Sequence, residues 1–123
     1  MKKPVIVAID DEAEFISVLK DYFGLRGYDI EVALRGAKGI EIAREKKPDV
    51  VLMDIELPLM DGIATTAKLR AVAPTCAVVI LSLYDDAKMR TRAQAAGAAA
   101  FVGKQEQGET LLAAIRQAAQ SRQ

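Results

Sequence analysis

The chain has 123 residues, with 17 Lys or Arg, 17 Asp or Glu and no His, so its formal net charge is zero. This length predicts one domain over residues 1–123, and the balanced charge argues against direct nucleic-acid binding, which would need a basic surface. With no His and the single cysteine Cys76, the composition excludes Ser-His-Asp catalysis, Cys-His catalysis and zinc sites built from Cys and His.

The sequence predicts no membrane contact. No apolar run approaches the ~18–20 residues of a membrane-spanning helix. The first run, Val5–Ile9, has five apolar residues and ends at Asp10, whereas a signal-peptide core needs at least about seven. One cysteine cannot form an internal disulfide, so the fold needs no oxidising compartment. We therefore expect a cytoplasmic protein.

Five short apolar runs recur at regular intervals and predict five β-strands, at residues 5–9, 28–33, 50–53, 77–81 and 98–102. Most runs are continuous, which is typical of strands buried on both faces of a parallel sheet. The second run is different, because Tyr28, Ile30 and Val32 alternate with other residues. This period of two predicts a half-exposed strand at a sheet edge.

Between these runs the apolar spacing becomes helical. The predicted apolar faces are Phe15, Val18, Leu19, Tyr22 and Phe23; Ile40 and Ala43; Ile63, Ala67 and Ala71; Met89, Ala93 and Ala96; and Leu111, Leu112, Ile115, Ala118 and Ala119. We expect Pro48, Pro74 and Gly97 to end the second, third and fourth helices. Five strand–helix repeats predict an α/β fold with a parallel sheet, right-handed connections and helices on both faces.

Polar side chains stand at the ends of four predicted strands: Asp10 and Asp11, Asp54, Ser82, and Lys104. Ligands of open α/β sheets bind beyond the carboxyl ends of the strands, so we expect these side chains to converge. Crowded carboxylates repel one another unless a cation lies among them. Because Mg²⁺ prefers oxygen ligands, an ammonium pairs with phosphate and an Asp can accept a phosphoryl group, the set predicts a phosphoryl site with a divalent cation.

Each of these residues also has a structural interpretation. An Asp-Asp pair before a helix is often an N-cap with first-turn acids. Asp54 and Ser82 would then simply end strands, and Lys104 would be a solvated charge. Their joint placement at four strand ends favours the functional interpretation.

Four segments resemble the receiver domains of two-component response regulators (CheY-like): residues 7–12 (VAIDDE), 53–62 (MDIELPLMDG), 80–82 (ILS) and 97–104 (GAAAFVGK). The second segment is the most specific, because Pro58 stands four residues after Asp54 and Asp61-Gly62 follow at seven and eight. The resemblance covers essentially the whole chain. It implies a flavodoxin-like (βα)5 three-layer sandwich, with a five-stranded parallel sheet in the order 2-1-3-4-5.

The resemblance also implies roles for the residues at the strand ends. Asp54 would be the phosphoacceptor, Ser82 would donate a hydrogen bond to a phosphoryl oxygen, and Lys104 would pair with another. The implied Mg²⁺ ligands are Asp11, Asp54 and the backbone carbonyl of Glu56, with Asp10 acting from a greater distance. Pro58 and Gly62 would shape the loop after Asp54.

A signalling switch is the function that the resemblance implies. The domain would take a phosphoryl group from a sensor histidine kinase or a phosphotransfer protein, and would catalyse only its own phosphorylation and dephosphorylation. Ser82 and Phe101 would then remodel the face of the fourth helix, fifth strand and fifth helix to control a partner or an output domain. A homodimer is one form that this control could take. The sequence identifies neither the kinase nor the output, and it fits both a stand-alone receiver and part of a larger regulator.

Several residues depart from the common pattern of that family. Gln105 follows Lys104, where many relatives have a Pro in a cis bond, and a cis bond before a non-proline residue costs ~2.5–4 kcal/mol. Phe101 stands in place of the commoner Tyr, so no switch hydroxyl is present. Glu56 and Tyr84 lie where relatives tune the lifetime of the phosphoryl group, and we expect altered dephosphorylation.

Two other functions remain as alternatives. A phosphatase of the haloacid-dehalogenase type would carry Asp-x-Asp at the first strand, whereas Asp54-Ile55-Glu56 stands at the third. A pseudo-receiver would be an interaction module that is never phosphorylated, and the retained acids, Ser82 and Lys104 argue against it. A magnesium titration would discriminate this last alternative.

Overall fold

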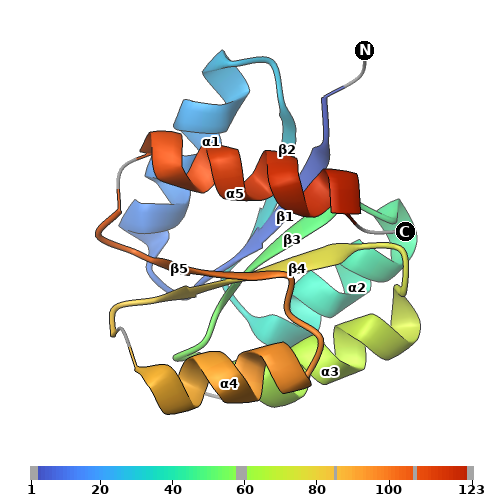
Figure 1. The fold of residues 1–123 in the computed structure, drawn as a ribbon. Coiled ribbons are helices and arrows are strands. Elements are labelled where there is room, and N and C mark those ends of the chain that lie inside the picture. Colours follow the sequence, from blue (N-terminus) through green and yellow to red (C-terminus); the bar gives the residue numbers. More distant parts are fainter. Residues whose placement is uncertain (1–2, 58–60, 85, 107, 122–123) are drawn as a thin grey trace.

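The computed structural model describes residues 3–57, 61–84, 86–106 and 108–121 (Figure 1). Within these ranges strands and helices alternate: β1 (Val5–Ile9), α1 (Ala13–Leu25), β2 (Asp29–Ala33), α2 (Gly36–Lys46), β3 (Val50–Asp54), α3 (Gly62–Val72), β4 (Ala77–Ser82), α4 (Ala87–Ala95), β5 (Ala100–Gly103) and α5 (Gly108–Ser121). The strands pair in parallel in the order β2-β1-β3-β4-β5. This confirms the predicted flavodoxin-like sheet, with β2 at an edge.

The sheet lies between two layers of helices. Helices α1 and α5 cover one face, and α2, α3 and α4 cover the other (Figure 1). Successive side chains of a strand point to opposite faces, so Ile6 and Ala8 of β1 pack with the first layer and Val7 and Ile9 with the second. β3 and β4 are buried along their whole length, as their continuous apolar runs predict.

The apolar face predicted for α1 is partly wrong. Leu19 and Phe23 are buried, but Val18 is 64% exposed. Ile16, which the prediction omits, is buried instead. Ile16 stands three and seven residues before Leu19 and Phe23, so these three share one face, whereas Val18 lies off it. The face that packs on the sheet is therefore rotated from the predicted one.

The face predicted for α3 is wrong at two of its three positions. The structure buries Ile63, Thr65, Thr66 and Leu69 and exposes Ala67 and Ala71. The Thr66 hydroxyl donates to the Gly62 carbonyl at 2.8 Å, so the polar group is satisfied within the helix and the side chain can be buried. The faces predicted for α2, α4 and α5 are confirmed, since their apolar residues are buried or partly buried.

Three strands, β3, β4 and β5, end one residue later than predicted, and in β3 and β4 this makes Asp54 and Ser82 part of the strand. β5 begins at Ala100 rather than at residue 98. The reason lies at the end of α4, where Gly97 has a φ of 106° and the Ala98 N–H donates to the Ala93 carbonyl at 3.0 Å. The chain is still turning at Ala98, and Gly97 ends the helix as predicted.

Gly62 allows α3 to begin directly against the backbone of β3. A Cβ at this position would lie 2.5 Å from the Ile55 Cα and 2.8 Å from the Asp54 carbonyl oxygen, which is too close for any side chain. The structural role expected for Gly62 is therefore confirmed, while Pro58 lies outside the described residues. None of the helices in the described ranges combines the length and the apolar character that a bilayer crossing requires.

Candidate functional site

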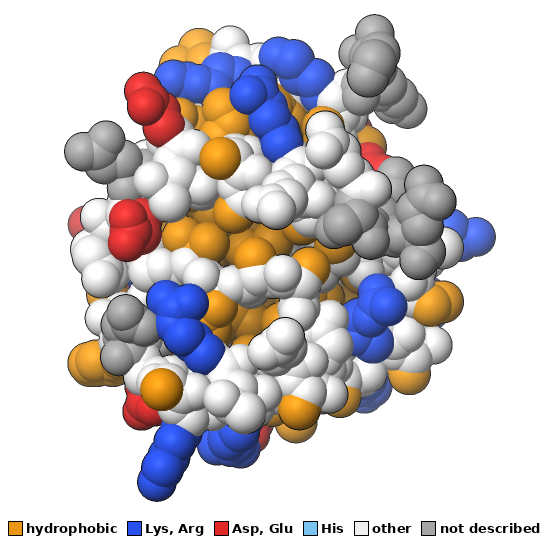
Figure 2. Space-filling view, in the orientation of Figure 1, with side chains coloured by type: hydrophobic (Ala, Val, Ile, Leu, Met, Phe, Trp, Pro, Cys, Tyr) orange, Lys and Arg blue, Asp and Glu red, His pale blue; other side chains and the backbone are white. Residues whose placement is uncertain are grey.

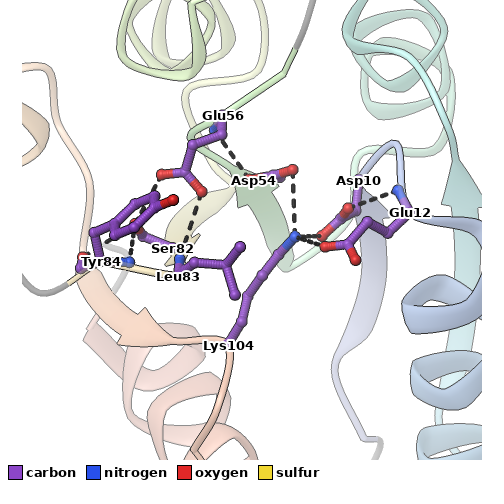
Figure 3. Close-up of polar contacts among 8 residues, drawn as sticks. All are labelled: Asp10, Glu12, Asp54, Glu56, Ser82, Leu83, Tyr84 and Lys104. Atoms are coloured by element: carbon purple, nitrogen blue, oxygen red, sulfur yellow. Dashed lines mark hydrogen bonds and ion pairs between the residues drawn. The ribbon is translucent and has the colours of Figure 1, made fainter.

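The predicted site residues meet at the carboxyl edge of the sheet (Figure 3). Asp10 directly follows β1 and its N–H donates to the Ala33 carbonyl, while Asp54 is the last residue of β3. Ser82 ends β4, and its carbonyl accepts from the Lys104 N–H at 2.8 Å. Asp10, Asp54 and Ser82 are each at most 2% exposed. The parallel strands therefore deliver three buried polar groups and one lysine to the same edge.

Three carboxylates of this edge could hold a metal ion. One carboxylate oxygen from each of Asp10, Asp11 and Asp54 lies within 4.8 Å of the others. Asp10 and Asp54 are buried and Asp11 is exposed, so the group opens to solvent on one side. Carboxylate oxygens are the ligands that a hard divalent cation prefers. The structure thus brings together the predicted acidic ligands.

Lys104 supplies the positive charge among these acids. Its Nζ lies 2.8 Å from Asp10 Oδ2, 2.6 Å from Glu12 Oε1 and 3.5 Å from Asp54 Oδ2, and its side chain is only 5% exposed. Burial lowers the pKa of Lys104, but the hydrogen bonds to Asp10 and Glu12 outweigh this, and the net pKa is raised. The ammonium therefore stays charged at any pH near neutrality. The peptide bond between Lys104 and Gln105 is trans.

Burial raises the pKa of Asp54 to about 7. The backbone N–H of Glu56 opposes this rise, the charge of Asp10 adds to it, and the charge of Lys104 lowers the pKa. Near neutral pH the Asp54 carboxyl therefore gains a proton readily in the absence of a further cation. A divalent ion beside it would favour the ionised form.

Asp10 and Asp54 are oriented in the same way. Asp10 Oδ1 accepts from the Glu12 N–H and Asp54 Oδ1 accepts from the Glu56 N–H, each at 2.9 Å. In both cases the donor is the amide two residues further on, a local geometry that is typical of Asp. The second oxygen of each carboxylate faces Lys104 Nζ. The backbone thus fixes one oxygen of each acid and leaves the other for the site.

Ser82 is held by Glu56 (Figure 3). Its Oγ donates to Glu56 Oε2 at 2.8 Å, and the Leu83 N–H points to Glu56 Oε1 at 3.4 Å. The same Oγ accepts from the Tyr84 N–H at 3.1 Å. Ser82 is at the predicted place, but its hydroxyl is engaged by a neighbouring carboxylate.

The sequence did not predict two side-chain contacts of the site, that of Glu12 with Lys104 and that of Glu56 with Ser82. Glu12 follows the acid pair and reaches Lys104, which stands 92 residues later in the chain. Glu56 was singled out for its carbonyl and its place after Asp54, and not as a partner of Ser82. Its carbonyl as a metal ligand stays a prediction. The available signal was a glutamate two positions beyond Asp10 and another two positions beyond Asp54.

Phe101 lies in β5, away from the cluster of acids. Its ring is half-buried against the layer of α2, α3 and α4, and the Arg90 guanidinium lies 4.7 Å from the ring centroid. A groove of about 280 Å³ between α4 and β5 is lined by both residues and by Ala93. The switch role of Phe101 stays a prediction.

Comparison with known proteins matches residues 6–116 to the response regulator receiver domain. The transcriptional regulatory protein KdpE of Mycobacterium tuberculosis is 35% identical over 114 residues, 93% of this chain and 50% of that protein. PrrA of Mycobacterium leprae is 29% identical over 89 residues, 70% of this chain and 38% of that protein. The chain thus spans half or less of these two relatives.

Solved structures show the same fold. The BeF3-activated N-terminal receiver domain of Klebsiella pneumoniae RstA has a TM-score of 0.87 and 29% identity, over 94% of this chain and 98% of that one. A CheY-like receiver domain from Methanospirillum hungatei has a TM-score of 0.91 at 22% identity, over 98% and 97% of the two chains. With the family match over most of its length, this chain belongs to the receiver domains of two-component response regulators.

Proposed function

We propose that the chain is a phosphorylation-dependent switch in which Asp54 accepts a phosphoryl group. The observation that carries this proposal is the buried carboxylate of Asp54, which lies close to the acids Asp10 and Asp11 and to the ammonium of Lys104. The proposed donor is a sensor histidine kinase or a phosphotransfer protein. In this proposal the domain catalyses only its own phosphorylation and dephosphorylation. We expect the protein to be cytoplasmic.

The proposed reaction is an in-line transfer. Asp54 Oδ2, the oxygen that is not held by the Glu56 amide, attacks the phosphorus of a phosphohistidine. The new P–O bond forms as the P–N bond breaks, and the electron pair of that bond returns to the histidine nitrogen. Most of the catalysis is positioning and charge stabilisation, because such transition states spread negative charge over the phosphoryl oxygens.

The described residues fit a magnesium ion beside Asp54. Asp10, Asp11 and Asp54 would hold it together with the Glu56 carbonyl, and when bound it would offset the negative charge of the transferring group. The Lys104 ammonium, which contacts three carboxylates, would also pair with a phosphoryl oxygen. Ser82 would donate its hydroxyl to another phosphoryl oxygen.

The proposed output surface is the face formed by α4, β5 and α5, which is turned toward the viewer in Figure 2. Hydrophobic side chains gather in the middle of this face, below α5 and above α4. Phosphorylation would shift an existing equilibrium so that Ser82 and Phe101 move toward the site and this face changes. A partner protein, an output domain or a second copy of the chain would read that change.

Intact mass spectrometry tests the proposal. The chain is incubated with acetyl phosphate and Mg²⁺, beside Asp54→Ala and the control Asp29→Ala, which changes an exposed acid at the start of the edge strand β2. We expect one phosphoryl addition to the wild type and the control, and none without Mg²⁺ or in Asp54→Ala. If neither this addition nor beryllofluoride binding occurs with Mg²⁺ present, the chain is a pseudo-receiver.

A further inference from the structure

We propose that Glu56 is a positioning residue for Ser82. In the unphosphorylated chain its carboxylate holds the Ser82 hydroxyl and the Leu83 amide, and phosphorylation must break this contact before Ser82 reaches the phosphoryl group. This inference rests on the proposed function of Asp54 and adds a residue that regulates the same site.

The contacts join the segment after β3 to the end of β4 and the residue that follows it. Glu56 Oε2 accepts from Ser82 Oγ at 2.8 Å, and Glu56 Oε1 lies 3.4 Å from the Leu83 nitrogen. Both oxygens of one carboxylate are therefore directed at consecutive residues at the end of β4. Among the described residues, the ion pairs at this edge join Lys104 to Asp10, Glu12 and Asp54, and none involves Glu56. The Glu56 carboxylate is thus occupied by hydrogen bonds rather than by the lysine.

The Ser82 hydroxyl has one proton, for which three acceptors compete: Glu56 Oε2 at 2.8 Å, the Tyr84 carbonyl at 3.1 Å and a phosphoryl oxygen on Asp54. While the proton is donated to Glu56 Oε2 it is not available to a phosphoryl oxygen on Asp54. The Tyr84 N–H donates to the Ser82 oxygen at 3.1 Å and leaves that proton free to be donated elsewhere. A hydrogen bond to a charged acceptor is stronger than one between neutral groups, so the proton is donated to the Glu56 carboxylate rather than to the neutral Tyr84 carbonyl while Asp54 carries no phosphoryl group.

Glu56 also contacts the phosphoacceptor itself, through its backbone. Its N–H donates to Asp54 Oδ1 at 2.9 Å, while its side chain holds Ser82. One residue therefore fixes the orientation of the acceptor and engages the residue that responds to it. Substituting the side chain leaves the backbone contact in place, so the two roles can be tested separately.

A double-mutant cycle tests the inference. Affinity for beryllofluoride in the presence of Mg²⁺ is measured by NMR titration in the wild type, Glu56→Ala, Ser82→Ala and the double variant. Removing the competing acceptor should tighten binding by about five- to tenfold in the wild-type background. In the Ser82→Ala background, Glu56→Ala should change the affinity for beryllofluoride by a factor at least about threefold smaller, because the hydroxyl that Glu56 held is gone.

Two further variants control for charge and shape. Glu45→Ala removes an exposed acid in the last turn of α2, at the opposite edge of the sheet, and should leave the affinity unchanged. Glu56→Gln keeps the shape and an oxygen acceptor without the charge, and should tighten binding less than Glu56→Ala does. In the ligand-free protein, hydrogen exchange of the Leu83 amide should be several-fold faster in Glu56→Ala.

The outcomes separate this inference from the proposed function. If the wild type binds beryllofluoride but Glu56→Ala changes the affinity equally in both Ser82 backgrounds, Glu56 acts through charge or bulk alone and the inference is wrong. Unchanged exchange of the Leu83 amide would contradict it as well. If the wild type does not bind beryllofluoride with Mg²⁺, the proposed function fails, and this inference fails with it.

Discussion

The ammonium nitrogen of Lys104 lies 2.8 Å from Asp10 Oδ2, which joins the loop after β5 to the end of β1 across the sheet. Both side chains are almost completely buried, at 5% and 1% exposure. A buried charge without a partner is strongly unfavourable, so each of these residues depends on the other. The pair is therefore part of the folded structure and also part of the proposed phosphoryl site.

Replacing Lys104 should destabilise the chain. Lys104→Met keeps much of the side-chain volume but leaves the buried carboxylate of Asp10 without its cation, and we expect a loss of about 3 kcal/mol in the free energy of unfolding at pH 7. The exposed pair Lys46–Glu31, at 3.7 Å, provides the control, because Lys46→Met should cost less than about 1 kcal/mol. Urea denaturation of both variants measures the difference. Equal losses would contradict the importance of the buried pair.

Asp54 should make the stability of the chain depend on pH. Its pKa is raised from 3.8 to about 7, so between these values the folded state holds a proton that the unfolded state releases, and stability falls as pH rises. Above pH 7 the loss is complete. Asp54→Asn removes the effect, and at pH 8 without Mg²⁺ it should be more stable than the wild type by about 2–4 kcal/mol.

Urea denaturation from pH 4 to pH 8 in EDTA checks this expectation. The advantage of Asp54→Asn should be small near pH 4, should grow up to about pH 7, and should then level off. A constant difference across the whole range would show that the Asp54 carboxyl has an ordinary pKa in the folded chain.

Magnesium binding should depend on Asp11 without a matching change in stability. Asp11 is exposed and Asp10 is buried in its contact with Lys104. Asp11→Asn should therefore weaken Mg²⁺ binding by about tenfold or more, while it changes the free energy of unfolding by less than about 0.5 kcal/mol. Isothermal titration calorimetry at pH 8 measures the affinity, with Asp29→Asn as the control. An unchanged affinity would place the ion elsewhere.

A tryptophan at position 101 should report the switch directly, because the natural chain has none. In Phe101→Trp the indole starts half-exposed near Arg90, and movement toward the site should bury it. We expect the emission to shift to shorter wavelength when Mg²⁺ and beryllofluoride are added, and to stay constant in an Asp54→Ala background. No shift in either background would argue against movement of this side chain.

The sequence predicted the fold and the place of the site because both depend on patterns that act over short distances. Continuous apolar runs mark buried strands, and a polar residue that ends such a run must lie at the edge of the sheet, which located Asp54 and Ser82. The roles of the Glu12 and Glu56 side chains depend on distances between segments that are 92 and 26 residues apart. No local pattern encodes which flexible carboxylate reaches Lys104 or Ser82.

The errors in the helix faces have a similar origin. Val18 and Ile16 are both apolar, and only packing on the sheet decides which one is buried. In α3 the prediction chose Ala67 over Thr66, because a threonine counts as polar until its hydroxyl is seen to donate to the Gly62 carbonyl. Chemical type along the chain is a weaker guide than satisfied hydrogen bonds in three dimensions.

The position of Lys104 also determines the order in which the site is completed during synthesis. The acids at the ends of β1 and β3 emerge from the ribosome first, whereas the lysine belongs to the loop after β5. A growing chain that has reached only β4 therefore carries Asp10 and Asp54 without their cation. The edge gains its buried ammonium only when β5 joins the sheet, so the chemistry proposed for Asp54 requires that this strand is in place.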